Sequence, residues 1–257
     1  MPGPDSKGAP TVVGTAVFPE ERDARPPVLG FRDVSKLYLP GGRSVTALRH
    51  VSLDVRSGEF VALVGRSGSG KSTFLNLAGA VDTPTSGHVL LEGRSTEGLK
   101  DEELTCLRRE RVGFVFQFFH LFPTLSALEN VEIPLQLAGR RRTRRRAAEM
   151  LALVGIPDLA DRLPHQLSGG QLQRVAIARA LGSEPALVLA DEPMGNLDTH
   201  TAEEVMALFR LINLQLGTTI VMATHSLESA AATDRILTLR DGELVSDLPT
   251  GAAGGAT

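Results

Sequence analysis

Gly65-Arg66-Ser67-Gly68-Ser69-Gly70-Lys71-Ser72 decides the fold of this chain, because it fits the phosphate-loop pattern G-x-x-x-x-G-K-[ST]. The apolar run 60–64 before it predicts a buried strand, and residues 73–77 after it predict the start of a helix. Glycines let backbone N–H groups curl around a triphosphate, and the helix N-terminus adds partial positive charge. We expect Lys71 to reach the β- and γ-phosphates and the Ser72 hydroxyl to bind Mg²⁺. The alternative, a glycine-rich surface turn, does not require the flanking strand and helix.

Composition narrows the class of protein. With 257 residues and 42% hydrophobic residues, the chain can form one large α/β domain. It has no apolar run of membrane-spanning length, and its N-terminus lacks the apolar core of a signal peptide. Cys106 is the only cysteine, which is typical of a reducing cytosol. A net charge of −3 gives no basic footprint for nucleic acid, and no Cys or His pair has zinc-ligand spacing.

The pattern along the chain predicts an α/β fold. Residues 1–26 and 247–257 are rich in Pro, Gly and other small residues and predict flexible tails around a domain at 27–246. Polarity alternates at 28–34 and 51–55, which predicts a β-rich first part, whereas 100–182 looks helical, with an insert at about 118–182. Apolar strands at 59–64, 186–190 and 218–224, separated by helices, imply a mostly parallel sheet covered on both faces. A hairpin signal at 236–245 closes the domain.

Two acids follow the second apolar strand. Asp191 and Glu192 stand in the sequence Leu-Val-Leu-Ala-Asp-Glu-Pro. An acid at a strand end beside a phosphate loop is how such ATPases hold Mg²⁺, so we expect Asp191 to bind the metal. Glu192 would then orient or deprotonate the attacking water. The alternative is a solvated acidic pair, which the phosphate loop disfavours.

A second helix start carries two glycines. Ser168 and Gln171 form a capping box, which by itself indicates only the beginning of a helix. Gly169 and Gly170 weaken a helix by up to about 1 kcal/mol each, and a cap does not need them. An anion lying against bare backbone N–H groups does need them. The sequence therefore predicts a second phosphate-binding helix end about a hundred residues after the first.

Leu167-Ser168-Gly169-Gly170-Gln171, followed by Gln173-Arg174, resembles the signature of ATP-binding cassette (ABC) ATPases, and the resemblance covers about residues 28–245. It implies a P-loop NTPase (RecA-like) core with an N-terminal antiparallel β subdomain and an inserted helical subdomain. It also implies roles for further residues: Tyr38 stacking on adenine, Gln117 contacting Mg²⁺ and water, Asp198 in the loop at the dimer interface, and His225 bonding the γ-phosphate. The nucleotide-binding residues it implies are Tyr38, Gly65, Arg66, Ser67, Gly68, Ser69, Gly70, Lys71, Ser72, Thr73, Ser168, Gly169, Gly170, Gln171 and Asp198.

The resemblance also implies a mechanism. Two cassettes, identical or paralogous, meet head to tail around two ATP molecules, so Ser168 and Gly170 of one subunit complete the site of the other. Lys71, Gln117, Glu192 and His225 carry the hydrolysis of ATP, with Mg²⁺ bound by Ser72, Gln117 and Asp191. Opening and closing of the dimer drives a separate integral-membrane permease, which places the cassette on the cytoplasmic side of the membrane.

Residues 118–131 and 190–198 are similar to the lipoprotein-release and macrolide-export subfamily. Arg66 replaces a frequent proline and Met194 a frequent threonine, and neither position has a required chemical role. Large apolar residues at 118–122 suggest a docking groove, although packing beneath a helical insert would use them equally well. A cassette of DNA repair or translation, and a regulatory cassette that controls cell-wall enzymes through a membrane partner, are the alternatives.

Six arginines between 140 and 146 are the local charge anomaly. They could touch anionic lipid headgroups, or they could hint at nucleic acid, although the net charge leads us to expect no nucleic-acid partner. The remaining interpretation is a solvated helix start, in which consecutive arginines point all around the axis.

Overall fold

The computed structural model describes residues 25–39, 41 and 44–250. Two sheets form its framework: a four-stranded antiparallel sheet in the order β2-β1-β4-β5 and a six-stranded sheet in the order β10-β9-β3-β8-β7-β6. The strands are β1 (Pro27–Tyr38), β2 (Val45–Arg56), β3 (Phe60–Val64), β4 (Ser86–Leu91), β5 (Arg94–Ser95), β6 (Val112–Phe116), β7 (Leu187–Asp191), β8 (Thr219–Thr224), β9 (Arg235–Arg240) and β10 (Glu243–Pro249). In the six-stranded sheet β6, β7, β8, β3 and β9 run parallel, and β10 pairs antiparallel with β9.

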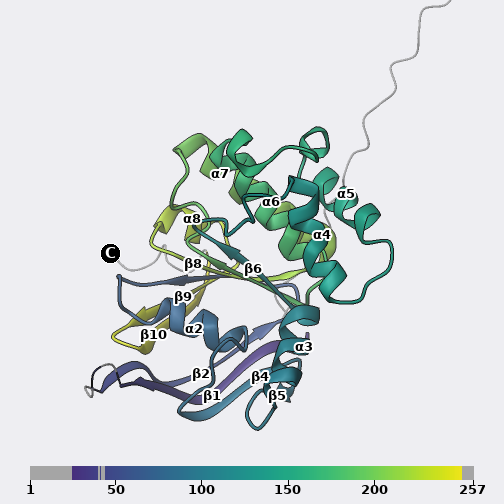
Figure 1. The fold of residues 1–257 in the computed structure, drawn as a ribbon. Helices are drawn as coiled ribbons and strands as arrows, with labels where there is room; N and C mark the ends of the chain where they lie inside the picture. Colours follow the sequence, from purple (N-terminus) through teal and green to yellow (C-terminus); the bar gives the residue numbers. More distant parts are fainter. Residues whose placement is uncertain (1–24, 40, 42–43, 251–257) are drawn as a thin grey trace, which may run out of the picture.

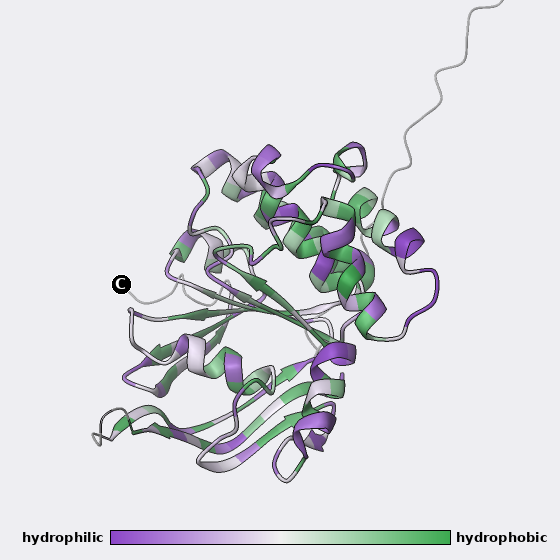
Figure 2. Ribbon diagram, in the orientation of Figure 1, coloured by the Kyte–Doolittle hydropathy of each residue, from purple (hydrophilic) through white to green (hydrophobic). Residues whose placement is uncertain are grey.

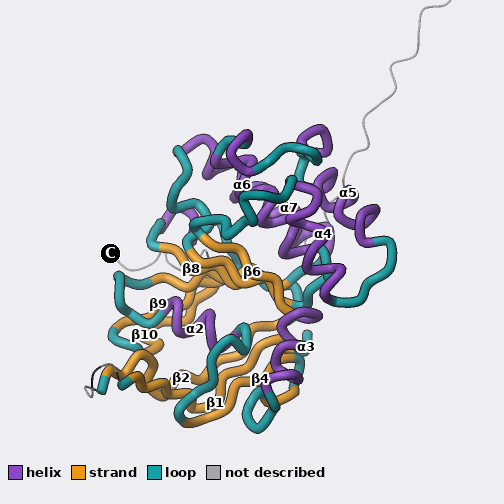
Figure 3. Tube along the Cα trace, viewed as in Figure 1, coloured by secondary structure: helices purple, strands orange, loops and turns teal. Residues whose placement is uncertain are grey.

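Helices cover the larger sheet on both faces, as Figures 1 and 3 show. They are α2 (Lys71–Ala78), α3 (Asp101–Arg111), α4 (Ala127–Leu137), α5 (Thr143–Leu153), α6 (Gly169–Leu181), α7 (Thr199–Leu216) and α8 (Leu227–Ala231), with short 3₁₀ turns at Pro157–Leu159 and Pro164–Gln166. The helix α2 lies between the two sheets, whereas α4, α5, α6 and α7 pack together on the other side. The α/β architecture with an antiparallel β subdomain is therefore confirmed.

Alternation along the central strands creates two cores. Val221 and Ala223 of β8 face the core that contains α2 and the antiparallel sheet, whereas Ile220 and Met222 face the core that contains α4, α5, α6 and α7. Successive side chains of a strand point to opposite faces, so a strand buried on both faces must be apolar throughout. Figure 2 shows these strands as hydrophobic bands.

The structure corrects two expectations. Residues 112–116 form the strand β6, not part of a helical stretch at 100–182. A short apolar run is compatible with strand or helix, and its partner β7 lies far along the chain. The strand β10 also pairs with β9 as far as Pro249, so the ordered domain continues past the expected end at 246. Of the predicted tails at 1–26 and 247–257, residues 1–24 and 251–257 lie outside the described residues.

Candidate nucleotide-binding site

Four neighbouring parallel strands deliver the predicted residues to one edge of the sheet. In register, Val64 of β3 lies beside Thr224 of β8, and Asp191 of β7 lies beside Ala223 of β8 and Phe116 of β6. The residues that follow these strand ends, Gly65, His225, Glu192 and Gln117, therefore emerge together. In open α/β sheets, ligands bind outside the carboxyl ends of the strands, so this edge is the expected binding site.

The phosphate loop has a backbone that requires glycine. Gly68 and Gly70 have φ angles of 79° and 106°, in the region that side chains disfavour. A Cβ on Gly70 would also lie 2.5 Å from the carbonyl oxygen of Ala47, which leaves no room for a side chain. The helix α2 then begins at Lys71 without a side-chain cap. No side chain therefore occupies its first N–H groups, which leaves them available to an anion.

Lys71 reaches across the loop toward the acids. Its ammonium group donates a hydrogen bond to the carbonyl oxygen of Gly65 at 2.8 Å. The same nitrogen lies 3.8 Å from Oε1 of Glu192, and the side chain is only 9% exposed. Phosphate oxygens bound in the loop would therefore meet a desolvated positive charge, which interacts with them more strongly than an exposed one would.

Glu192 lies between Lys71 and His225. Its Oε2 is 2.8 Å from Nδ1 of His225 and also accepts the backbone N–H of His225 at 3.3 Å. The φ angle of Glu192 is 46°, an unusual value for a residue other than glycine. The backbone is fixed there because its N–H donates to the carbonyl oxygen of Ala223. A carboxylate held in this way can accept a proton from a nearby water molecule.

Ser72 and Asp191 form an oxygen pair suited to Mg²⁺. The Ser72 hydroxyl donates to Oδ2 of Asp191 at 3.0 Å. Mg²⁺ prefers hard oxygen ligands and commonly takes one or two from protein, with phosphate and water supplying the rest. Among the described residues no group of three or more His, Cys, Asp and Glu side chains could hold a metal by itself. The donor set therefore fits a metal that arrives with a nucleotide.

Gln117 is held by residues that sequence reasoning did not assign to the site. Its Nε2 donates to Oδ1 of Asn196 at 3.1 Å, and Nδ2 of Asn196 donates back to the carbonyl oxygen of Gln117 at 3.1 Å. A Cβ on Gly195 would lie 2.7 Å from Nε2 of Gln117, so the glycine makes space for the amide. Gly195 and Asn196 are neighbours in the chain but lie far from Gln117 in sequence, and the pairing of β6 with β7 brings them to it.

A groove of about 500 Å³ joins these groups. It is lined by Val45, Thr46, Ala47, Ser67, Gly68, Gly70, Lys71, Ser72, Thr73, Gln117, Asp191, Glu192 and His225. Of the other predicted loop residues, Gly65 and Arg66 give their carbonyl oxygens to Lys71, and Ser69 is buried. Residues 45–47 of β2 form one wall of the groove, and no sequence pattern predicted that they would line it.

Tyr38 lies next to the groove but not in its lining. It pairs in the sheet with Val45, which lines the groove, and its hydroxyl donates to Oδ2 of Asp82 at 2.8 Å. The ammonium group of Lys36 lies 5.0 Å from the ring centroid, so a cation already covers the ring. Burial, reinforced by the hydrogen bond to Asp82, raises the pKa of Tyr38 above its ordinary value of 10.0.

The helix end at Ser168 belongs to a different surface. Ser168 accepts the backbone N–H of Gln171 at 3.3 Å, and Gln171 accepts the N–H of Ser168 at 2.9 Å, which completes the predicted capping box. A Cβ on Gly170 would lie 2.4 Å from Cγ2 of Thr201, so close packing against α7 also requires this glycine. Asp198 caps α7 by accepting from Thr201, and these hydrogen bonds lower its pKa. Within the described part of the chain, none of these residues lines the groove.

A partly buried arginine connects the two surfaces. Arg179 of α6 donates to the carbonyl oxygens of His120 at 2.5 Å and Phe119 at 2.9 Å, just after Gln117. Both residues have positive φ angles, 48° and 61°, so the segment is bent against its preference. Burial lowers the pKa of the Arg179 guanidinium, which nevertheless stays charged at neutral pH. The predicted signature helix is therefore bonded to the segment that carries Gln117.

Comparisons with known proteins agree with this geometry. A family model described as "ABC transporter" matches residues 48–195. An uncharacterized ABC transporter ATP-binding protein of Thermotoga maritima is 49% identical over 84% of this chain and 93% of its own length. The macrolide export ATP-binding/permease protein MacB of Brucella melitensis is 46% identical over 86% of this chain, which spans 34% of that longer protein.

A solved structure of an ATP-binding cassette is also similar to this chain. It is the ATP-binding cassette MJ0796 of Methanocaldococcus jannaschii, described as a dimer in a post-hydrolysis state bound to ADP and Pi. Its TM-score to this chain is 0.80 at 44% identity, covering 86% of this chain and 98% of that one. In the part of the present chain that the structure describes, no helix is long and apolar enough to cross a membrane.

Proposed function

The chain belongs to the ABC transporter family, as an ATP-binding and ATP-hydrolysing protein, and from this we propose that two copies close head to tail around two ATP molecules. Each ATP lies in the groove of one copy and against the Ser168–Gln171 helix end of the other. The observation that carries this proposal is the separation of the two helix ends that the sequence predicts to bind phosphate: the groove lining includes the start of α2 but not the start of α6. A second cassette, identical or paralogous, would bring them together, and a relative is a dimer bound to ADP and Pi.

In the proposed reaction each group of the groove has one task. The loop and Lys71 hold the phosphates. Ser72, Asp191 and Gln117 would hold Mg²⁺, which would neutralise charge that develops on the phosphates. Glu192 takes a proton from the water that attacks the γ-phosphate. His225 keeps the carboxylate in place and bonds the γ-phosphate through its other ring nitrogen.

We also propose that the dimer drives an integral-membrane permease of the macrolide-export or lipoprotein-release type, from the cytoplasmic side of the membrane. Support comes from the similarity to MacB, whose name joins an ATP-binding part to a permease. Phe118 and Phe122, directly after Gln117, are 67% and 52% exposed and offer an apolar contact for such a partner. Motion of this segment would reach the groove through Gln117.

Glu192→Gln tests the catalytic assignment. It removes the proton acceptor but keeps the shape of the side chain, so ATP binding persists while turnover falls by roughly 10²–10³-fold. With hydrolysis slowed, ATP should shift the protein to a dimer in size-exclusion chromatography. A turnover within about threefold of the unmodified protein would contradict the role of Glu192.

Ser168→Arg in the Glu192→Gln background tests the dimer. The added side chain blocks the helix end, so ATP should no longer cause dimerisation. Ser126→Arg is the matched control, because Ser126 forms the same capping box with Glu129 at the start of α4. Equal dimerisation of both variants would rule out the head-to-tail arrangement while leaving ATP binding untouched.

A further inference from the structure

Five arginines line a pocket of about 360 Å³ at the start of α5. They are Arg140, Arg141, Arg142, Arg145 and Arg146, and the opposite wall is the turn after α6 at residues 182–184. Among the described residues, none lines both this pocket and the nucleotide groove. Figure 2 shows the connection between α4 and α5 and the start of α5 as strongly hydrophilic. The pocket is thus a separate feature that the proposed ATPase cycle does not use.

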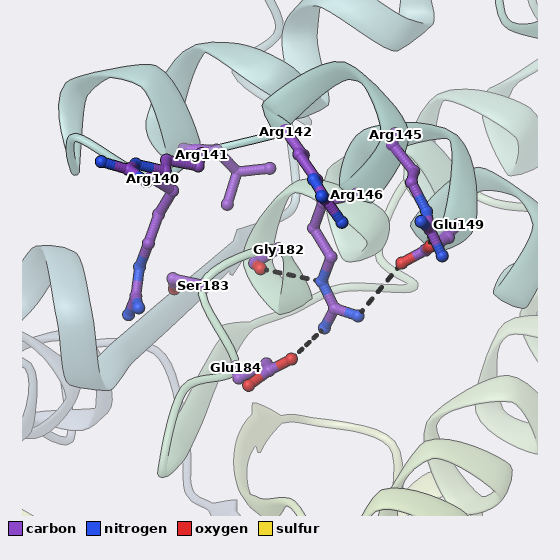
Figure 4. A pocket seen from close by; sticks show the side chains of 10 residues that line it. Arg140, Arg141, Arg142, Arg145, Arg146, Glu149, Gly182, Ser183 and Glu184 are labelled. Atoms are coloured by element: carbon purple, nitrogen blue, oxygen red, sulfur yellow. Dashed lines mark hydrogen bonds and ion pairs between the residues drawn. The ribbon is translucent and has the colours of Figure 1, made fainter.

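The arginines are gathered on one side rather than spread around the helix. Arg142, Arg145, Arg146 and Glu149 are spaced at i, i+3, i+4 and i+7, which places them on one face of α5. Arg144 does not line the pocket. Figure 4 shows this face meeting Arg140 and Arg141 from the preceding connection. The arginines therefore do not point all around the axis: five of the six line the pocket, and Arg144 does not.

Only part of this positive charge is neutralised. Arg146 pairs with Glu184 at 3.0 Å and Glu149 at 3.7 Å, and Arg145 pairs with Glu149 at 2.9 Å. The side chains of Arg140, Arg141 and Arg142 have no hydrogen-bond or ion-pair partner among the described residues. Five arginines against two glutamates leave an excess of three positive charges around the pocket.

The backbone at the same place also favours an anion. Arg142 is the N-cap of α5 with a φ angle of 57°, it makes no side-chain cap, and the first turn contains no acid. Thr143, the next residue, donates its hydroxyl to Glu132 at 2.8 Å and so does not cap the helix either. The positive end of the helix dipole therefore lies beside the arginines. Glu132 places one carboxylate there, at Thr143, and a further anion would still be favoured.

We propose that this pocket binds a phosphate group, either in the headgroup of an anionic phospholipid or in a free phosphorylated compound. Guanidinium groups bind phosphate oxygens through paired, charge-assisted hydrogen bonds, and three of them here have no other partner. The bound phosphate would also add negative charge at the start of α5, whose own first turn contains no acid. Arg146 is held by both glutamates, and the arginines without partners, Arg140, Arg141 and Arg142, would contact the phosphate from the other residues of the pocket.

The first experiment measures binding to vesicles. The full chain is floated with vesicles of phosphatidylglycerol and phosphatidylcholine, and with pure phosphatidylcholine as a reference. Arg140→Ser/Arg142→Ser should lower partitioning onto the anionic vesicles by roughly thirtyfold, since each basic side chain near such a surface contributes about fivefold. The matched control is Arg144→Ser/Arg162→Ser, which removes the same charge from exposed positions outside the pocket.

The second experiment uses soluble inorganic pyrophosphate. With ADP saturating the nucleotide groove, the arginine Nε–H resonances are followed by NMR during the titration. Shifts of the pocket arginines that disappear in Arg140→Ser/Arg142→Ser but persist in the control identify a free phosphorylated ligand. The ATPase rate of both variants, measured in detergent-free buffer, should remain within about twofold of the unmodified protein, because neither residue pair touches the groove.

The outcomes are distinct. Pocket-dependent binding of anionic vesicles alone identifies a lipid headgroup, and pocket-dependent binding of pyrophosphate identifies a free ligand; either supports the proposal. Equal losses in the pocket and control variants would mean that net charge alone attracts anions, and would overturn it. Binding of neither probe would overturn it as well. So would a single-stranded oligonucleotide that binds through these arginines while both probes do not.

Discussion

At the scale of single residues, Tyr38 provides a spectroscopic signal from one known position. It is the only tyrosine in a chain without tryptophan, so tyrosine absorbance and fluorescence report on one position. Its hydroxyl donates to Asp82, and burial together with this bond raises its pKa. The neutral form is thus favoured by folding, and this stabilisation is complete below the unfolded pKa of about 10 and is lost as pH rises through the folded value.

Titration of the tyrosinate absorbance should therefore give a midpoint above 10 in the folded protein. Asp82→Asn removes the carboxylate charge, so the midpoint of the Tyr38 titration should fall toward the ordinary value. A midpoint at the ordinary value in the unmodified protein would contradict the hydrogen bond.

Tyr38 also tests the adenine contact. ATP should change the fluorescence of Tyr38, with ADP acting similarly and pyrophosphate having no effect. Equal fluorescence responses to ATP and pyrophosphate would contradict the stacking of adenine on Tyr38.

The position of the Gln117 amide depends on its neighbours Gly195 and Asn196. We expect Asn196→Ala to release its amide, and Gly195→Ala to push it aside, because the added Cβ would overlap Nε2. Both changes should misplace the Gln117 amide, which we expect to contact Mg²⁺. Turnover should therefore fall by roughly tenfold to a hundredfold, with ATP binding retained. The concentration of Mg²⁺ that half-saturates hydrolysis should rise in both variants. If it stays unchanged while turnover falls, Gln117 does not contact the metal.

At the scale of elements, Arg179 joins α6 to the segment that follows β6. Its two hydrogen bonds hold Phe119 and His120 in conformations that cost free energy, so their loss should release the segment. We expect Arg179→Ala to lower the free energy of unfolding by about 2–4 kcal/mol. It should also accelerate amide hydrogen exchange at residues 117–122 and reduce turnover more than ATP affinity.

Arg174→Ala is the matched control for this prediction. Arg174 lies on the same helix but bonds the carbonyl oxygen of Val154 and the carboxylate of Glu204. Its loss should destabilise the protein without changing exchange at residues 117–122. Similar exchange in both variants would mean that Arg179 contributes only to general stability and does not position Gln117.

The elements themselves differ in how well the sequence predicted them. The strand β3 and the helix α2 are fixed by local signals: five apolar residues, then glycines that only a turn with positive φ angles requires. The pattern at 100–182 predicts helix for the segment that forms β6, because Val112–Phe116 has no periodicity that distinguishes a strand from a helix. Its identity depends on pairing with β7, a contact between segments far apart in sequence.

At the scale of the whole molecule, the proposed head-to-tail dimer has a kinetic consequence. If the start of α6 from a second copy completes each site, the ATPase rate per chain should rise with protein concentration until the dimer is saturated. Measuring turnover over a hundredfold range of concentration, alongside sedimentation, checks this. A constant rate per chain from a protein that stays monomeric would show that one chain hydrolyses ATP unaided.

The sequence by itself determined the phosphate loop, the acids Asp191 and Glu192, the capping box at Ser168 and the family, because each is a local pattern with its own chemistry. Only the tertiary structure decided what holds these groups: Asn196 against Gln117, Arg179 behind the following segment, and Thr201 against Gly170. It also gathered the arginines of α5 into a pocket. The physical reason is the same in each case. Parallel strands and packed helices join residues far apart in the chain, and no local periodicity records which partners will meet.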